Sequence, residues 1–229
     1  MNALIKPARG AIAAIMMVSA TLAQAQIKIT EVAPWGSSGS NPSIPYTTDW
    51  FELTNTGSSA VSIAGWQMDD NSNGTGKVAM TGISTIAAGE SVIFTELAAT
   101  PVFLNTWFGA NSPVGLQIGN YTGLGVGLSS NGDAVNIYNA TGVLQANVVF
   151  GVADNTSPYQ TFDNAAGLNN TTISQLSVVG ANGAFVAAND AAEIGSPGRI
   201  APVPEPESYA LLLAGLGLMG AMVRRRTSN

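Results

Sequence analysis

The sequence of 229 residues contains no cysteine and no histidine. Without histidine, Ser-His and Cys-His catalytic pairs and histidine metal sites are excluded, because each needs an imidazole that exchanges protons or binds metal near neutral pH. Without cysteine, disulfides, thiolate zinc sites and thiol catalysis are excluded as well. The folded chain must therefore be stabilised by its hydrophobic core without covalent or zinc crosslinks.

Basic residues are also scarce, with 8 Lys and Arg against 14 Asp and Glu. Residues 26–200 keep three basic residues against twelve carboxylates, a formal charge of −9. A charge of this sign is repelled by the phosphate backbone, so we expect no nucleic-acid partner. The same region is rich in Asn, Gly, Ser and Thr. It is typical of a secreted protein that stays soluble through polar side chains and negative charge.

The N-terminus has the three parts of a signal peptide. Two basic residues precede the run AIAAIMMVSATLA, which has the length of a signal-peptide core and is too short to cross a bilayer permanently. Ala23 and Ala25 then supply the small-x-small cleavage pattern. We predict a signal peptide over residues 1–25 and a mature chain that begins at Gln26.

The C-terminus is also built of three parts. In order, these are a linker over 201–208 that contains Pro204, Glu205 and Pro206, an apolar run over 209–223, and a basic tail over 224–229 that contains Arg224, Arg225 and Arg226. A helix of this run reaches about 22 Å, less than the ~30 Å hydrocarbon core. We predict a short transmembrane segment whose arginines stay cytoplasmic, which leaves residues 26–200 on the outer side.

This tail resembles the PEP-CTERM sorting signal of Gram-negative bacteria, over roughly the last 27 residues. The resemblance implies recognition by an exosortase, a membrane-embedded processing peptidase, and removal of the tail in systems linked to exopolysaccharide production. The alternative is an ordinary single-span anchor that contains the PEP sequence by chance. The tail also matches G-x-G-x-x-G at 215–220, but no strand-turn-helix context accompanies it, so we do not expect a nucleotide site.

Between the two ends the hydrophobic pattern is mainly β. Ile27, Ile29 and Val32 mark a first strand. The pattern further predicts two antiparallel strands joined by a turn over 50–66, a strand over 90–94, a helical turn over 101–108, and a hairpin over 134–151. Many short strands with turn residues between them predict an all-β sandwich.

The linked series IKITEV, DWFELTN, VSIAGWQMDD, GESVIFTE, LSSNGDAVNIYNATGVLQANVVFG and a closing GSPG resembles the lamin-tail domain, over about residues 27–198. The resemblance implies an immunoglobulin-like β-sandwich of the kind found in nuclear lamins and in exported bacterial proteins. It implies no catalytic residues. The expected organisation is a lamin-tail domain over 26–200, between the signal peptide and the sorting tail.

The carboxylates are the only titrating groups left in quantity, and three of them lie near one another in the sequence: Glu31, Asp49 and Glu52. A glycosidase needs two carboxylates about 5 to 10 Å apart, one with a raised pKa, so a carboxylate-only hydrolase is one hypothesis. The simpler interpretation is structural. An acid at the start of a strand and another on its polar face are typical of a half-exposed sheet edge.

The stretch from Asp69 to Gly74 matches the first half of a calcium loop, with Asp69, Asn71 and Asn73 at alternate positions. The second half fails, because Met80 stands where the closing bidentate glutamate is required. A calcium-dependent module is therefore an alternative function, and an Asn/Gly/Asp turn after a strand is the simpler interpretation.

Aromatic residues raise the possibility of a carbohydrate-binding surface. A sandwich without disulfides depends on large apolar side chains, so Trp50 and Trp66 are expected inside the core. Trp35 and Tyr46 lie in a long polar loop and are the candidates for sugar stacking.

The sequence as a whole predicts an exported, non-catalytic protein of the cell surface or extracellular matrix. Its role is expected to be structural or adhesive, in an exopolysaccharide or biofilm setting. We expect no metal and no cofactor. Exosortase is the expected processing partner, the inner membrane is at least a transient location, and extracellular polysaccharide or surface proteins are further candidate partners.

Overall fold

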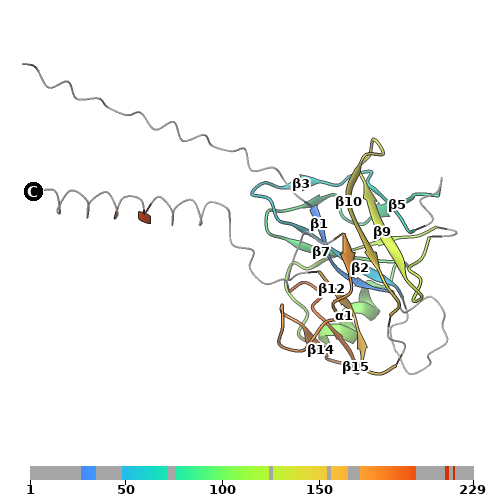
Figure 1. Ribbon diagram of the computed structural model, residues 1–229, viewed down its shortest axis with the longest axis vertical. Helices are drawn as coiled ribbons and strands as arrows, with labels where there is room; N and C mark the ends of the chain where they lie inside the picture. Colours follow the sequence, from blue (N-terminus) through green and yellow to red (C-terminus); the bar gives the residue numbers. More distant parts are fainter. Residues whose placement is uncertain are drawn as a thin grey trace, which may run out of the picture.

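The computed structural model describes residues 27–34, 48–71, 76–123, 126–153, 156–164, 171–199, 215–216 and 219. Most of these residues form one β-rich body with a single short helix (Figure 1). The predicted signal peptide and the predicted PEP linker lie outside the described residues, as does most of the predicted transmembrane run. Among the described residues, no helix has the length and apolar character needed to span a bilayer.

Ten strands form one continuous sheet that folds over into two layers. The first layer has the order β12-β1-β2-β7-β8, and the second has the order β4-β9-β10-β13. The first-layer strands are β1 (Ile27–Ala33), β2 (Trp50–Asn55), β7 (Ser91–Thr95), β8 (Gln117–Tyr121) and β12 (Phe162–Asp163). The second-layer strands are β4 (Gln67–Asp69), β9 (Asp133–Tyr138), β10 (Leu144–Phe150) and β13 (Thr172–Ile173).

The two layers are joined along both edges of the sandwich. At each edge, one segment of chain pairs first with one layer and then with the other. On one side, strand β5 (Val78–Thr81) pairs with β4 through its first half and with β8 through its second half. On the other side, β13 pairs with β10, and the chain just after it pairs with β12 through the bridge between Phe162 and Leu176. The expected immunoglobulin-like β-sandwich is thus confirmed, with little open edge between its layers.

The main core lies between the two layers. Alternate residues of each strand point inward, as the period of two in a strand requires. The inward residues are fully buried and include Ile29, Val32, Phe51, Leu53, Phe94, Val135, Ile137, Val148 and Phe150. Phe150 of β10 packs across this space against Phe162 of β12, with ring centroids 5.4 Å apart. Within the first layer, Phe51 of β2 stacks on Phe94 of the neighbouring strand β7 at 5.7 Å.

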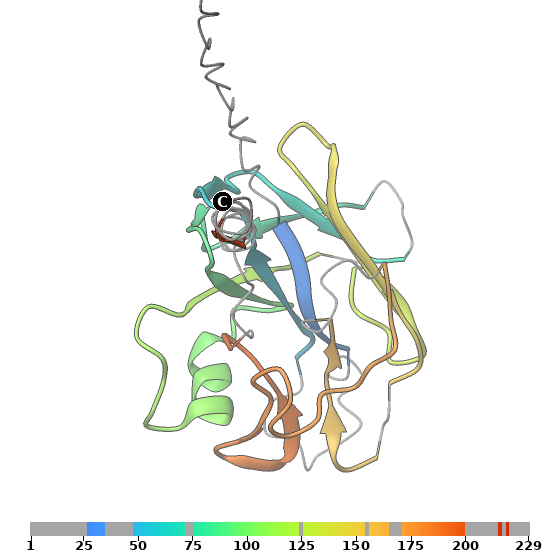
Figure 2. The same cartoon turned by 60° about the vertical axis from the view of Figure 1, so that its left-hand side comes forward.

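A third layer covers the outer face of the first layer (Figure 2). It consists of α1 (Thr100–Phe108) and a small sheet of β11 (Tyr159–Gln160), β15 (Asp190–Gly195) and β14 (Phe185–Ala187). Trp107 of α1 packs edge-to-face on Trp50 of β2, with ring centroids 5.6 Å apart. The outer face of β2 is therefore buried under aromatic side chains at its Trp50 end.

Several predicted elements are confirmed. Strand β1 begins at Ile27, the predicted strand over 90–94 is β7, and the predicted hairpin is the antiparallel pair β9 and β10. The predicted helical turn is α1, with Pro101 in its first turn, where a missing N–H costs no helical hydrogen bond.

The predicted pairing within residues 50–66 is wrong. Strand β2 pairs with β1 on one side and β7 on the other, so it has no free edge for the chain that follows it. That chain instead forms β3 (Val61–Ser62), which pairs with β6 (Thr85–Ile86), and then joins the second layer as β4. The Asn55 side chain redirects the chain by donating hydrogen bonds to the carbonyls of Ser59 and Ile86, at 2.8 and 3.1 Å.

Candidate functional site

Two buried glutamates hold the C-terminal end of the domain. Glu31 of β1 accepts hydrogen bonds from the main-chain N–H of Ser196 at 2.7 Å and from the Ser196 hydroxyl at 3.1 Å. The Thr161 hydroxyl donates a third, at 2.5 Å. Glu31 has no exposed area. A buried carboxylate with three donors is a strong local anchor for the segment that supplies them.

Glu52 of β2 holds the same segment two residues further on. Its Oε2 atom accepts a hydrogen bond from the main-chain N–H of Gly198 at 2.6 Å, and its Oε1 atom accepts one from the Thr30 hydroxyl at 2.5 Å. Glu52 also has no exposed area. We call the two glutamates, together with the N–H groups of Ser196 and Gly198, the carboxylate clamp.

The backbone of β1 explains why Glu31 belongs to this clamp. Regular alternation from Ile27 and Ile29 would turn residue 31 toward the main core. A β-bulge between Ile29 and Glu31 shifts the register, so Val32 enters the core and Glu31 turns outward to face the third layer. In that register Glu31 lies directly opposite Glu52 on β2 and opposite Asp163 on β12.

The clamp raises the proton affinity of its own carboxyl groups. Burial raises the pKa of Glu31 well above its ordinary value, and the neighbouring Glu52 carboxylate raises it further. Burial also raises the pKa of Glu52 to about 7, although the hydrogen bonds from Thr30 and Gly198 act in the opposite direction. The pair therefore retains part of a proton at neutral pH.

Two close carboxyls with raised pKa values are the groups that the hydrolase hypothesis requires, but their setting does not suit catalysis. Neither Glu31 nor Glu52 has any exposed area, so a substrate reaches them only if the covering chain at 195–198 is removed. The interpretation of Glu52 as a polar residue on a half-exposed sheet is also wrong, because the third layer covers that face.

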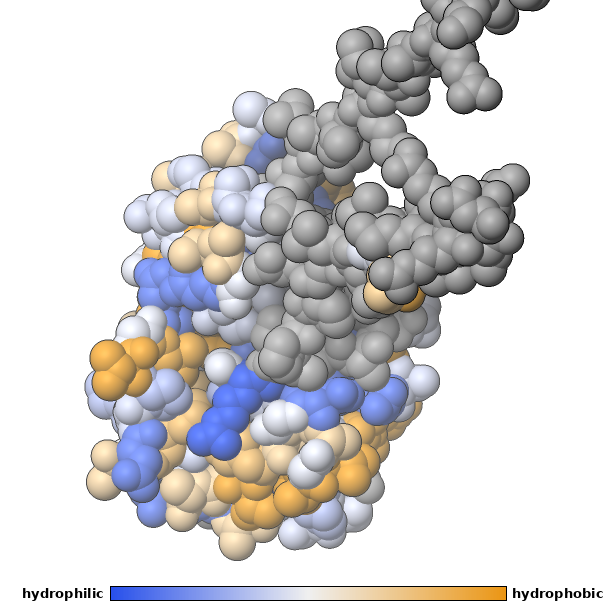
Figure 3. All heavy atoms as spheres, turned by 90° about the vertical axis from the view of Figure 1, so that its left-hand side faces the viewer, coloured by the Kyte–Doolittle hydropathy of each residue, from blue (hydrophilic) through white to orange (hydrophobic). Residues whose placement is uncertain are grey.

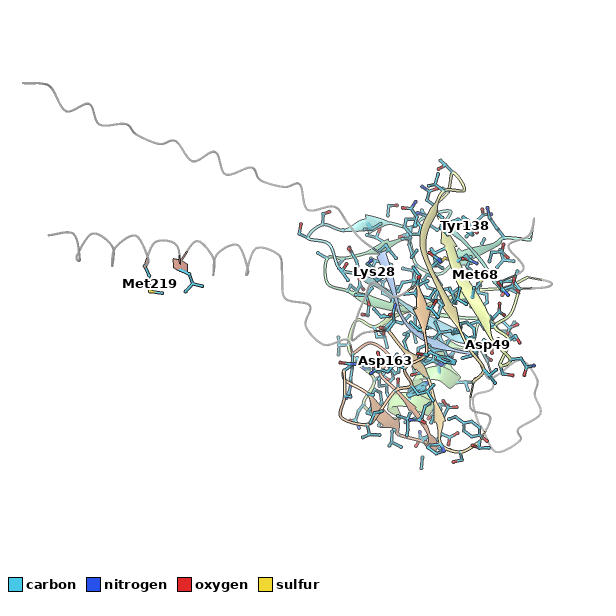
Figure 4. The ribbon with its side chains drawn as sticks, in the orientation of Figure 1. Lys28, Asp49, Met68, Tyr138, Asp163 and Met219 are labelled. Atoms are coloured by element: carbon cyan, nitrogen blue, oxygen red, sulfur yellow. The ribbon has the colours of Figure 1, made fainter. Side chains whose placement is uncertain are left out.

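Asp49, the third candidate of the hydrolase hypothesis, does not join the pair. It lies just before β2, three residues from Glu52, and the period of two in a strand turns the two side chains to opposite faces. Its Oδ2 atom accepts the main-chain N–H of Leu128 at 2.8 Å. Asp49 and Asp163 lie apart in Figure 4, and Asp163 is the acid that accompanies Glu31 and Glu52. The structure thus brings together two of the three candidates.

The calcium-loop hypothesis falls partly on residues that are not described, because Asn73 and Gly74 lie outside them. The described part is an ordered turn. Asp133 accepts the main-chain N–H groups of Asn71, Ser129 and Ala134, each at 2.8 Å. Met80, at the position of the missing closing glutamate, is a buried core residue of β5. Within the described residues, no group of three or more acidic side chains is placed to hold a metal ion.

The large aromatic residues divide as the sequence predicts, as far as they are described. Trp50 and Trp66 are buried, and so are Trp107, Tyr121 and Tyr159. Trp66 and Tyr121 belong to the main core, and Trp50 and Trp107 belong to the core beneath the third layer. The five buried rings offer no platform for a sugar. Trp35 and Tyr46, the candidates for sugar stacking, lie outside the described residues.

The negative charge of the domain is mostly internal, contrary to the part of the solubility expectation that relied on negative charge. Nine of the carboxylates are buried: Glu31, Asp49, Glu52, Asp69, Asp70, Asp133, Asp163, Asp190 and Glu193. Several of them accept main-chain N–H groups, which lets a carboxylate order a turn or a chain end. The described surface therefore carries few ionised side chains, and its exposed residues are mainly Gly, Ala, Val and uncharged polar residues.

Sequence reasoning missed Ser196 and Gly198 of the carboxylate clamp and two residues beside it, Thr161 and Asp163. They lie far along the chain from Glu31, so no local pattern connects them with it. One local signal existed, because the spacing of Ile27, Ile29 and Val32 breaks the period of two and indicates a bulge. A bulge next to a glutamate indicates that the glutamate is turned out of the main core.

Comparison with known families identifies two regions of the chain. A family model described as Lamin Tail Domain matches residues 20–151, which is more than half of the chain. A second model, described as PEP-CTERM protein-sorting motif, matches residues 202–226. No curated protein matches the chain. The first match ends at Gly151, so the chain that covers the carboxylate clamp lies between the two matched regions.

Proposed function

The chain belongs to the lamin tail domain family, and from this membership and its sorting motif we propose that it is a non-catalytic structural or adhesive component of an extracellular matrix rich in polysaccharide. The PEP-CTERM motif marks the protein for export through the membrane and for processing by exosortase, with a surface or extracellular destination. Neither the lamin tail domain nor the sorting motif is a catalytic domain. The matrix role is the part that we propose.

The observation that carries the proposal is the position of the sorting motif directly behind a completed β-domain. The clamp fixes Ser196 and Gly198, and the match to the motif begins at residue 202. A folded domain that is followed directly by a removable tail is what we expect of a protein in which the domain is the part that is exported. The burial of Glu31 and Glu52 supports a structural use of these acids over a catalytic one.

The surface also suits a matrix setting. Few ionised side chains are exposed, because nine carboxylates are buried. Uncharged polar side chains hydrogen-bond to sugars without the salt dependence of ionic contacts. The closed sandwich leaves little free strand edge, which favours a protein that persists in a crowded matrix without uncontrolled strand pairing.

The test of sorting is the intact mass of the protein recovered from its native cells, after separation of membrane, outer-surface and medium fractions. We expect a chain that begins at Gln26 and ends near Pro206, in the outer-surface or medium fraction. The matched control replaces Pro204, Glu205 and Pro206 with alanine, and this variant should keep its tail and stay in the inner membrane. A wild-type protein that retains Tyr209 to Asn229 in the inner membrane would show an ordinary anchored domain instead.

The test of the matrix role uses the processed protein from those cells in pull-down with purified matrix polysaccharide and with extracted surface proteins. Binding to either supports an adhesive role, and absence of both contradicts it. Variants Trp35→Ala and Tyr46→Ala distinguish the carbohydrate-binding alternative. If aromatic stacking carries the binding, each variant loses affinity for the polysaccharide while its thermal stability is unchanged.

A further inference from the structure

The last described residues of the domain are fixed in place by several independent contacts. Arg199 follows the clamp directly, and its guanidinium lies 4.3 Å from the centre of the Phe185 ring. Its main-chain N–H donates to the Ser196 carbonyl at 2.8 Å. A Cβ atom placed on Gly183 would lie 2.2 Å from the Arg199 carbonyl oxygen, so the two backbones are in close contact. The chain therefore leaves the domain at a fixed point and on a fixed face.

The sorting tail starts only a few residues beyond this point. Pro204 to Pro206 lie within seven residues of Arg199, and the apolar run begins at Tyr209. A chain spans at most about 3.5 Å per residue, so ten residues reach no further than about 35 Å. A domain of this size has a radius of gyration of roughly 16 Å. While the apolar run is in a membrane, the domain is thus held within about its own diameter of the lipid surface.

The loops that flank the exit point carry exposed valines. Leu116 packs on Gly198, and Val114 in the same loop has a relative exposure of 104%. Gly183 contacts Arg199, and the turn that leads to it begins with Val178 and Val179, exposed by 56% and 53%. Figure 3 shows hydrophobic residues gathered over the lower part of this face, at the height where Figure 1 places α1, β14 and β15.

We propose that the exit face, defined as Val114, Val178, Val179 and Arg199, rests on the lipid surface while the tail is held in the membrane. This inference rests on the proposed sorting function, because it concerns the stage before the tail is removed. The occupant is a phospholipid interface, which accepts small apolar side chains among its headgroups and pairs its phosphates with an exposed guanidinium. Asp190 and Glu193, the described acids of residues 171–199, are buried and do not oppose the contact.

The short chain between Arg199 and Tyr209 acts as a tether, and it explains why so small a face is sufficient for contact with the membrane. Three valines and one arginine bind a membrane only weakly when the domain is free in solution. A short tether raises the effective concentration of the surface to the millimolar range, so a weak contact is populated. The exit face would then present the sorting motif at the membrane surface, where a membrane-embedded peptidase acts. Removal of the tail would release the domain from the lipid without any change of its fold.

The absence of cysteine from the chain makes a site-specific test possible. Val114→Cys and Val179→Cys are prepared in the full chain, labelled with a fluorophore, and reconstituted in vesicles of phosphatidylethanolamine and phosphatidylglycerol that contain a headgroup nitroxide lipid. The matched control is Val149→Cys on the outer face of β10, where the valine is exposed by 44% on the other side of the sandwich. We expect strong quenching at positions 114 and 179 and weak quenching at 149.

Flotation of the vesicles shows separately whether the tail inserts into the membrane and whether the exit face touches lipid. If the full chain floats with the vesicles and all three positions are quenched equally, or none is, the exit face does not rest on lipid and this inference is wrong. If the full chain does not float, the tail does not insert, and both the sorting proposal and this inference fail. A chain that ends at Pro206 should lose the quenching at 114 and 179, and persistence of that quenching would contradict the role of the tether.

Discussion

Glu31 and Glu52 lie directly opposite each other on β1 and β2, and each accepts a main-chain N–H from the same C-terminal segment. The segment is separated from them by 165 and 146 residues of sequence. The buried carboxylates of the first two strands are therefore hydrogen-bonded by residues that lie just before the sorting tail. Loss of these hydrogen bonds should therefore both destabilise the fold and release residues 196–198, which lead into the tail.

The raised pKa values of the clamp predict that the domain loses stability as pH rises. For Glu52, the folded pKa of about 7 lies above the ordinary value of 4.5, so the folded state binds the proton more tightly than the unfolded state. The stabilisation is complete below pH 4.5 and is lost as pH rises through 7, by about 3 kcal/mol. Glu31 acts in the same direction. Urea unfolding of the full chain at pH 5 and pH 8 measures the difference.

The control for this pH dependence is Glu52→Gln, which keeps an acceptor for Gly198 and cannot ionise. Its free energy of unfolding should change less between pH 5 and pH 8 than that of the wild type. An equal pH dependence in both proteins would mean that other groups dominate, and that the Glu52 pKa is not raised as the burial indicates.

A second prediction concerns the order of the C-terminal segment. Glu31→Ala removes the acceptor of Ser196 and Thr161 and leaves their donors buried without it, which costs roughly 2–4 kcal/mol. Amide hydrogen exchange at Ser196 and Gly198 should become faster than in the rest of the domain. Glu31→Gln is the matched variant, because it keeps an acceptor, and it should retain most of the protection. Equal exchange in both variants would mean that packing alone holds the segment.

The sequence predicts most strands of this fold but not what covers them. Apolar residues at or near a period of two locate β1, β7 and the β9–β10 hairpin, because every second side chain enters the main core. The same pattern marks Glu52 as facing away from the main core, which is correct. It cannot show that α1 and residues 195–199 bury that polar face, since the covering chain lies some 146 residues further on.

Sequence patterns do not predict which strands pair with each other. The turn at residues 56–60 has the composition of a hairpin turn, yet the chain crosses between the layers there. The reason is that β2 is central and already has two neighbours, a fact of topology that local composition does not contain. The calcium pattern is different, because the sequence already shows it to be incomplete at Met80, and the structure places that side chain in the core.

Calcium should therefore have little effect on the domain. Asp133 directs its carboxylate to main-chain N–H groups, and Met80 is buried against the core, so the described part of the loop lacks the ligands that a tight site requires. We expect the thermal midpoint to shift by less than about 2 °C between EDTA and millimolar calcium, which corresponds to well under 1 kcal/mol. A larger rise would show that residues 72–75 complete a site, and Asp69→Asn should then abolish it.

The closeness of the clamp to Trp107 predicts one substitution with a large effect. A Cβ atom on Gly195 would lie 2.6 Å from Oε1 of Glu31 and 2.8 Å from the Trp107 ring. Gly195→Ala must therefore push the carboxylate from its donors or displace the indole, at a cost of roughly 1–3 kcal/mol. Gly151→Ala is the matched control, since a Cβ atom there meets nothing within 4 Å. The free energy of unfolding of both variants is measured in urea. Equal values would mean that the space between β15 and the clamp accommodates a methyl group.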